Sequence, residues 1–157
     1  MSTSTTEIPT PEVGRYGLVT AAAPRLDIID DQIAWAEAEE AKGEMSAWAQ
    51  GNWVTSEAPC GTAYCIAGHV ASSVGEPEFV EAWWDPNIRI EQHRRTIGGE
   101  SFHVQAVAKA VLGLTDRQAI LLFSGGNGIL TLKAARDDIA AASDLPRRYT
   151  DEDGRPL

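Results

Sequence analysis

The chain is poor in cysteine, and it has no long run of apolar residues. Its 157 residues include two cysteines, which are too few for the disulfide framework of a small secreted domain. The longest apolar stretches, such as Ala119 to Phe123, fall far short of the roughly 20 residues that cross a bilayer as a helix. These absences predict a soluble protein with reduced thiols and without a membrane-spanning segment.

Basic side chains are also in short supply. The sequence has 13 Lys and Arg against 23 Asp and Glu, so that its formal net charge is −10. Such a charge repels phosphate groups, and we therefore expect neither nucleic acid nor an anionic membrane among the partners. The residues after Met1, STSTTEIPTPE, have neither the basic nor the apolar segment of a secretory signal. We expect a cytoplasmic protein.

Length and composition predict one domain with two polar ends. Residues 1–24 are rich in Ser, Thr, Pro and Ala and lack periodicity, which is typical of a flexible N-terminal arm. A helical domain is expected over residues 25–144, followed by a mobile C-terminal tail over residues 145–157. The predicted fold class is mainly α, with a single compact domain of about six helices and a small β-hairpin at about residues 88–103.

Helical spacing and stop signals place the helices that precede this hairpin. The first helix begins at Leu26 and ends near Gly43, since glycine readily adopts a left-handed conformation. Further short helices are predicted over residues 45–49, over residues 63–74 with Thr62 as N-cap, and over residues 77–84.

The clearest local pattern is a corner between two helices at residues 113–118. Gly113 stands where a helix ends in a left-handed conformation, and Thr115 with Gln118 has the spacing of a capping box. Apolar helical spacing continues to Phe123, and a last helix is expected before Pro146.

Both cysteines, one histidine and two tryptophans lie within residues 48–69, so chemistry is first sought there. Cys60 precedes a predicted helix, whose dipole lowers a thiol pKa. Over roughly ten residues this Cys-Gly pattern before a small-residue helix resembles the papain-like peptidases that process bacteriocins. The general base would be His103 or His93, with Asp116 as the carboxylate that orients it.

The same segment is also compatible with a zinc site. Cys65 and His69 share a helical face, Cys60 precedes them, and His103 or His93 would be the fourth ligand. The favoured interpretation is simpler: Cys65 packs as a small apolar residue, His69 forms a hydrogen bond across a helix contact, and Cys60 is buried. No resident metal or cofactor is therefore expected.

Adjacent tryptophans and a group of basic residues point to an interaction surface. Trp83 and Trp84 cannot both face one core, because successive helical side chains point about 100° apart. One of them is expected to be an exposed interface anchor. Arg89, Arg94 and Arg95 form a basic group that would contact an acidic partner. The alternatives are partial burial of the rings against a loop and a solvated basic hairpin.

Three motifs together suggest a family. The spacing Trp48-x4-Trp53, the segment CGTAYCIAGH at residues 60–69 and the corner AVLGLT-x2-QA-x3-F at residues 110–123 resemble small proteins of actinobacteria and their bacteriophages. The resemblance extends over residues 26–142 and implies a mainly helical protein of phage or actinobacterial origin, with no activity attached.

The expected function is that of a non-enzymatic, protein-binding helical domain, encoded by a phage and acting on a host protein in the bacterial cytosol. Two alternatives stay open. One is a Cys60-dependent hydrolase or transferase with His103 or His93 as base, and the other is a small zinc-binding module. The sequence does not indicate an oligomeric state.

Overall fold

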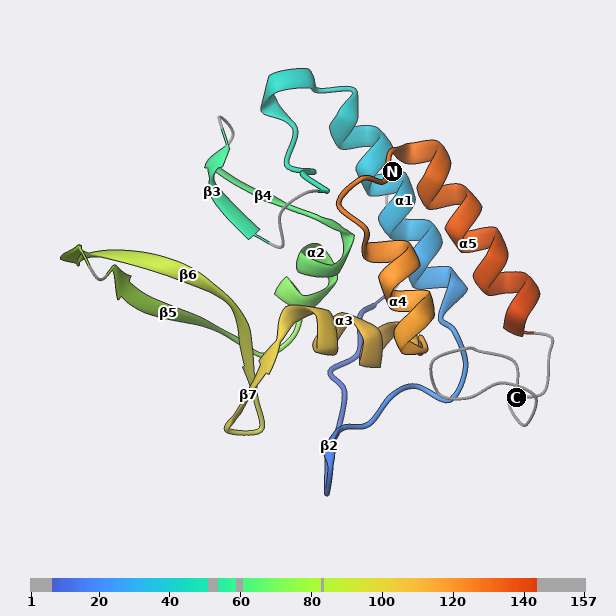
Figure 1. Cartoon of the computed structure of the whole chain (residues 1–157), viewed down its shortest axis with the longest axis horizontal. Helices are drawn as coiled ribbons and strands as arrows, with labels where there is room; N and C mark the ends of the chain where they lie inside the picture. Colours follow the sequence, from blue (N-terminus) through green and yellow to red (C-terminus); the bar gives the residue numbers. More distant parts are fainter. Residues whose placement is uncertain (1–6, 51–53, 59–60, 83, 144–157) are drawn as a thin grey trace.

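The computed structural model describes residues 7–50, 54–58, 61–82 and 84–143, and it combines helices with smaller antiparallel sheets (Figure 1). The helices of these residues are α1 (Leu26–Glu40), the 3₁₀ helix η1 (Gly43–Met45), α2 (Ile66–Ser72), α3 (Val104–Leu112), α4 (Asp116–Phe123) and α5 (Ile129–Ser143). The strands are β1 (Val13–Gly14), β2 (Gly17–Leu18), β3 (Val54–Ala58), β4 (Gly61–Tyr64), β5 (Glu76–Ala82), β6 (Asp85–Ile97) and β7 (Glu100–His103). The fold is mostly helical, and it contains more β-structure than the single small hairpin that the sequence predicted.

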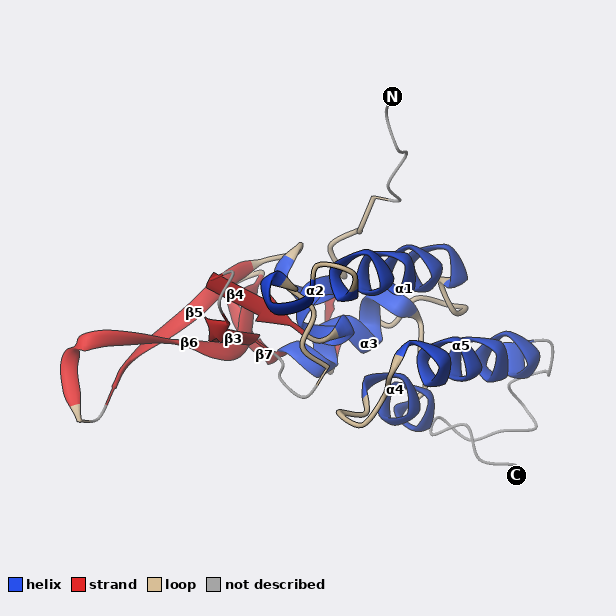
Figure 2. Cartoon of the chain, turned by 90° about the horizontal axis from the view of Figure 1, so that it is seen from above, coloured by secondary structure: helices blue, strands red, loops and turns tan. Residues whose placement is uncertain are grey.

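The hydrophobic core lies among the helices, and the strands extend to one side of it (Figure 2). α1 packs on α5, and α2 packs on α3. All five α-helices of the described residues contribute fully buried side chains, among them Ile28, Ile29, Ile66, Val70, Val107, Leu112, Leu122, Leu132 and Ile139. In the part of the chain that the structure describes, no helix has the length and apolar character needed to cross a membrane.

The first helix is confirmed, but the short helix predicted over residues 45–49 is wrong. α1 begins at Leu26 as expected, and only the 3₁₀ turn η1 follows it. Beyond η1 the chain is extended, because side chains accept the backbone N–H groups that a helix would use. Ser46 Oγ accepts from the N–H of Trp48 at 3.1 Å, and the Glu39 carboxylate accepts from the N–H of Ala47 at 2.9 Å.

The helix predicted over residues 63–74 begins later than expected. Gly61–Tyr64 forms β4, which pairs antiparallel with β3 through Val54 and Tyr64. The N-cap is therefore Cys65 and not Thr62, with Cys65 Sγ accepting from the N–H of Gly68 at 3.3 Å. Pairing with the strand just before it in the chain has overridden the local helical signal.

The helix predicted over residues 77–84 is also wrong, because residues 76–82 form strand β5. β5 pairs antiparallel with β6, with Val80 opposite Ile90 and Glu81 opposite Arg89. Pro77 at the start of this segment favours a first helical turn locally. Proline is also found near the beginning of edge strands, and β5 is an edge strand of the sheet order β5-β6-β7.

The predicted hairpin at residues 88–103 exists as part of this larger sheet. β6 and β7 pair with Ile97 opposite Glu100, and Arg94 opposite His103. The turn between them is Gly98-Gly99, whose φ angles of 59° and 80° favour glycine. β6 begins at Asp85 and is 13 residues long, so the strand is longer than the sequence predicted.

The corner at residues 113–118 is confirmed in detail. Gly113 has a left-handed φ of 68°, and the N–H of Leu114 donates to the carbonyl of Lys109 at 3.1 Å. Thr115 Oγ1 accepts from the N–H of Gln118 at 3.2 Å, and Gln118 Oε1 accepts from the N–H of Thr115 at 3.0 Å. The expected capping box therefore joins α3 to α4.

The N-terminal segment contacts the helices well before Leu26, where the sequence placed the start of the fold. β1 and β2 form a short antiparallel hairpin. After it the N–H of Ala21 donates to the carbonyl of Ala110 at 3.0 Å, and the N–H of Arg25 donates to that of Leu112 at 2.8 Å. These bonds satisfy carbonyls at the C-terminal end of α3, which a helix leaves unpaired.

Candidate functional site

Two of the predicted site residues lie at α2: Cys65 is its N-cap, and His69 lies on the helix where it contacts α1. The imidazole of His69 stacks on the indole of Trp35, with ring centroids 3.6 Å apart and planes 3° from parallel. His69 Nδ1 lies 2.6 Å from Gln32 Oε1. Because an amide oxygen only accepts hydrogen bonds, this contact assigns the proton to Nδ1. His69 thus makes the hydrogen bond across a helix contact that the sequence predicted.

The surroundings of His69 keep it neutral. Burial lowers its pKa to about 4, against an opposing effect from the nearby Glu39 carboxylate. Glu39 is itself buried, pairs with Lys42 and accepts from the N–H of Ala47. The hydrogen bond from Lys42 lowers the pKa of Glu39, although burial works in the opposite direction. A neutral imidazole and an ionised carboxylate are therefore expected at pH 7.

Gln50 connects this region to two helix ends. Its Oε1 accepts from Trp48 Nε1 at 3.0 Å and from the N–H of Ile66 at 3.3 Å. Its Nε2 donates to the carbonyls of Leu122 and Ser124, both at 3.2 Å. The start of α2 and the end of α4 are thus joined by one buried amide.

We refer to these side chains as the α1–α2 polar cluster, which consists of Gln32, Trp35, Glu39, Trp48, Gln50, Cys65 and His69. The sequence prediction missed Gln32, Glu39 and Gln50. One signal was available for Gln32, since it lies three residues after Ile29 on the face of α1 that Ile29 and Ile33 bury. A polar residue on a buried face needs a hydrogen-bond partner, and His69 is that partner.

Cys65 is a packing and capping residue. Its side chain is 1% exposed, and burial raises the pKa of its thiol despite opposing hydrogen bonds from backbone N–H groups such as that of Gly68. Metal ligation and nucleophilic attack both require the thiolate, which this environment disfavours. The favoured prediction for Cys65, a small apolar residue in the core, agrees with this geometry.

The structure places three of the four catalytic candidates on separate elements, and the predicted pairing of Cys60 with a base lies outside the described residues. His103 is the N-cap of α3, where its Nδ1 accepts from the N–H of Gln105 at 3.0 Å. Asp116 pairs with Lys109 at the α3–α4 corner, and His93 lies on β6. Cys60 falls outside the described residues.

The predicted zinc ligands are likewise only partly described. Within residues 7–50, 54–58, 61–82 and 84–143, no three or more His, Cys, Asp or Glu side chains form a group that could hold a metal ion. The prediction that Cys60 takes part in such a group falls on a residue that the structure does not describe.

Two of the three basic residues predicted to contact a partner, Arg94 and Arg95, have structural contacts of their own. Arg95 is 8% exposed and donates to the carbonyls of Val74 at 2.9 Å, Ser72 at 3.2 Å and Gly75 at 3.0 Å. Arg94 donates from Nε to Ser101 Oγ at 2.7 Å. Arg95 therefore holds the C-terminal end of α2, and Arg94 holds the β6–β7 hairpin together. Arg89 lies nearer the beginning of β6, opposite Glu81 of β5.

Trp84 is a large apolar side chain that lies exposed among the predicted interaction residues. Its side chain is 58% exposed, and it lies where β5 turns back into β6. The β5–β6 hairpin reaches farthest from the helices of all the strands (Figure 1). Trp83 lies outside the described residues.

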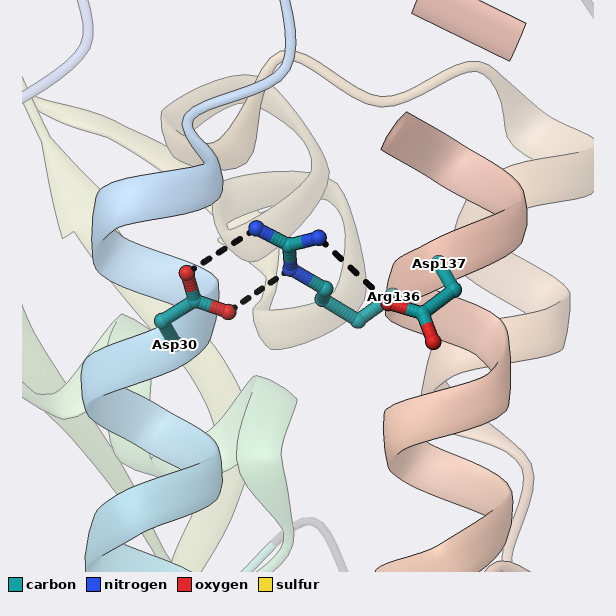
Figure 3. A network of polar contacts seen from close by, with 3 residues as sticks. All are labelled: Asp30, Arg136 and Asp137. Carbon is teal, nitrogen blue, oxygen red and sulfur yellow. Dashed lines mark hydrogen bonds and ion pairs between the residues drawn. The ribbon is translucent and has the colours of Figure 1, made fainter. Parts of the chain in front are cut away.

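An open cavity of about 320 Å³ lies between α1 and α5, lined by Asp30, Ile33, Ala34, Glu37, Lys133, Arg136 and Asp137. Arg136 donates to Asp30 from Nε at 2.8 Å and from Nη2 at 3.2 Å, and its Nη1 lies 3.4 Å from Asp137 (Figure 3). Lys133 pairs with Glu37 at 2.7 Å. The ion pairs Arg136–Asp30 and Lys133–Glu37 each join one helix to the other, and they link α1 to α5.

Comparisons with protein-family models, with curated proteins and with solved structures found no match to this chain.

Proposed function

We propose that this chain is a non-enzymatic protein-binding domain, encoded by a phage and acting on a host protein in the bacterial cytosol. The observation that carries the proposal is the 58% exposure of Trp84 at the end of the projecting β5–β6 hairpin (Figures 1 and 2). A tryptophan buries a large area with few rotatable bonds, and it is among the side chains that dominate binding energy at interfaces. The hairpin tip is thus the proposed contact site.

Two further features support binding over chemistry. Three residues that were candidates for chemistry have structural roles, since Cys65 and His103 cap helices and His69 stacks on Trp35. The net charge of −10 favours encounter with a protein that carries a basic surface. The phage origin rests on the motif resemblance at residues 48–69 and 110–123.

The test compares Trp84→Ala with the wild-type chain in a pull-down from an actinobacterial lysate. Leu130→Ala is the matched control, because Leu130 is an apolar residue that is 81% exposed on α5 rather than on the hairpin. We expect the wild type and Leu130→Ala to retain the same host protein. Trp84→Ala should bind that protein at least about tenfold more weakly in calorimetric titration. Equal affinity for all three chains would refute the proposal.

A further inference from the structure

We propose that the turn between β1 and β2 is a second docking element, whose Tyr16 enters an apolar pocket with a carboxylate rim on a partner protein. We call this element, residues 13–18, the Tyr16 hairpin. The inference rests on the proposed function, since it concerns the same host protein, and it deepens it by placing a second contact on a part of the chain that is separate from Trp84. In Figure 1 this hairpin points away from the helices at the lower edge of the molecule.

The first observation is exposure. The side chain of Tyr16 is 95% exposed, and Val19 just after the hairpin is 49% exposed. An aromatic ring and an aliphatic side chain therefore lie open to solvent on one short segment. Tyrosine is enriched at interfaces, because its ring fills a pocket while its hydroxyl keeps a hydrogen bond.

The second observation is that the base of the hairpin is held firmly. Val13 and Leu18, which are paired across the hairpin, also pack against the hydrophobic core. The N–H of Val19 donates to the carbonyl of Glu12 at 2.8 Å. A tip mounted in this way loses little conformational freedom when it binds, so that its contacts contribute more fully to affinity.

The third observation is charge. Between Glu12 and Asp27 the sequence has two basic residues and no acidic one. Arg25 pairs with Asp27 at 2.9 Å, whereas Arg15 is exposed beside Tyr16, with its guanidinium carbon 5.7 Å from the ring centroid. The tip thus combines a ring with a cation in a chain of net charge −10. Carboxylates around the receiving pocket would complement Arg15, and a second copy of this acidic chain would be repelled as a whole.

The experiment uses the host protein that the full-length wild-type chain retains from an actinobacterial lysate, purified and titrated by calorimetry. Tyr16→Ala should weaken binding about tenfold or more, whereas Tyr16→Phe, which keeps the ring, should stay within about threefold of the wild type. Arg15→Glu should also weaken binding, and the loss should shrink as the salt concentration rises. Thermal unfolding of each variant checks that the fold is unchanged.

The outcomes separate this inference from the proposed function. If Trp84→Ala weakens binding and Tyr16→Ala does not, the Tyr16 hairpin is not a docking element and the proposed function stands. If Tyr16→Ala alone weakens binding, the Tyr16 hairpin is supported and the contact at Trp84 is wrong. The inference is overturned if the wild-type chain retains no protein that Tyr16→Ala loses. It is likewise overturned if sedimentation shows a dimer of the wild type that Tyr16→Ala abolishes.

Discussion

Single polar side chains decide where several elements of this chain begin and end. Cys65, His103 and Thr115 each accept a backbone N–H at the start of a helix, and such caps offset the donors that the first helical turn leaves unpaired. Two of the three are residue types that suggested chemistry in the sequence. The side chains of Cys65 and His103 act as helix caps, so these two residues have a structural role.

His69 should make the protein sensitive to mild acid. Its pKa is about 4 in the folded chain against an ordinary value of 6.5, so the unfolded chain binds a proton first. The contribution of neutral His69 to the free energy of unfolding is then fully present above pH 6.5, and it is lost as the pH falls toward 4. Between pH 7.5 and pH 4.5 we expect the free energy of unfolding in urea to decrease by about 2 kcal/mol from this group.

The control for this effect is His69→Gln, which removes the titrating ring but keeps a polar side chain. This variant should be less stable at pH 7.5 and should show a flatter pH dependence down to pH 4.5. The largest cause that lowers the pKa of Glu39 is its hydrogen bond with Lys42, and the variant keeps Lys42, so most of the Glu39 contribution is common to both chains. A wild type and variant with parallel pH profiles would show that His69 is not responsible.

At the scale of elements, α2 depends on residues outside itself. It has seven residues, which is too short for a helix to be stable alone in water. Gln50 contacts its first N–H, and Arg95 donates to three carbonyls at and beyond its C-terminal end. Its small residues Ala67 and Ala71 are completely buried, so that a close approach to its neighbours adds to these polar contacts.

Arg95 offers the sharpest test of this arrangement. Arg95→Met keeps most of the apolar stem and removes three hydrogen bonds to backbone carbonyls, one buried and two partly buried, so we expect it to lower the free energy of unfolding by about 3 kcal/mol. Arg94→Met is the matched control, since it is the neighbour on the same strand and bonds the exposed Ser101. It should cost about 1 kcal/mol or less. Urea unfolding with equal losses for the two variants would contradict the assigned role of Arg95.

At the scale of the whole molecule, the chain before α1 and the strands after α2 both lie against the helical core. The N-terminal segment bonds the carbonyls of Ala110 and Leu112 at the end of α3. An added Cβ at Gly113 would collide with the backbone of Ala23. Segments about ninety residues apart in sequence are therefore in direct contact, and this contact requires the glycine.

Removal of residues 1–24 should therefore lower the free energy of unfolding of the remaining domain. The deletion removes the hydrogen bond from Ala21 and the packing of Val13 and Leu18, for an expected loss of at least about 2 kcal/mol in urea unfolding. Leu18→Ala should reproduce part of this loss, whereas Val19→Ala, at an exposed neighbouring site, should not. An unchanged unfolding midpoint after the deletion would place the segment outside the cooperative fold.

The sequence by itself determined those features whose causes are local. The start of α1 at Leu26, the left-handed Gly113, the Thr115–Gln118 capping box and the Gly98-Gly99 turn all depend on residues within a few positions of one another. The tertiary structure decided what depends on strand pairing and on packing, which the residues within one helical turn do not reveal. Residues 77–82 became a strand because β6 pairs with them, and Thr62 lost the capping role to Cys65 because β4 pairs with β3. The roles of Gln32 and Arg95 were decided in the same way, because a buried polar group requires a partner that its neighbours in sequence do not supply.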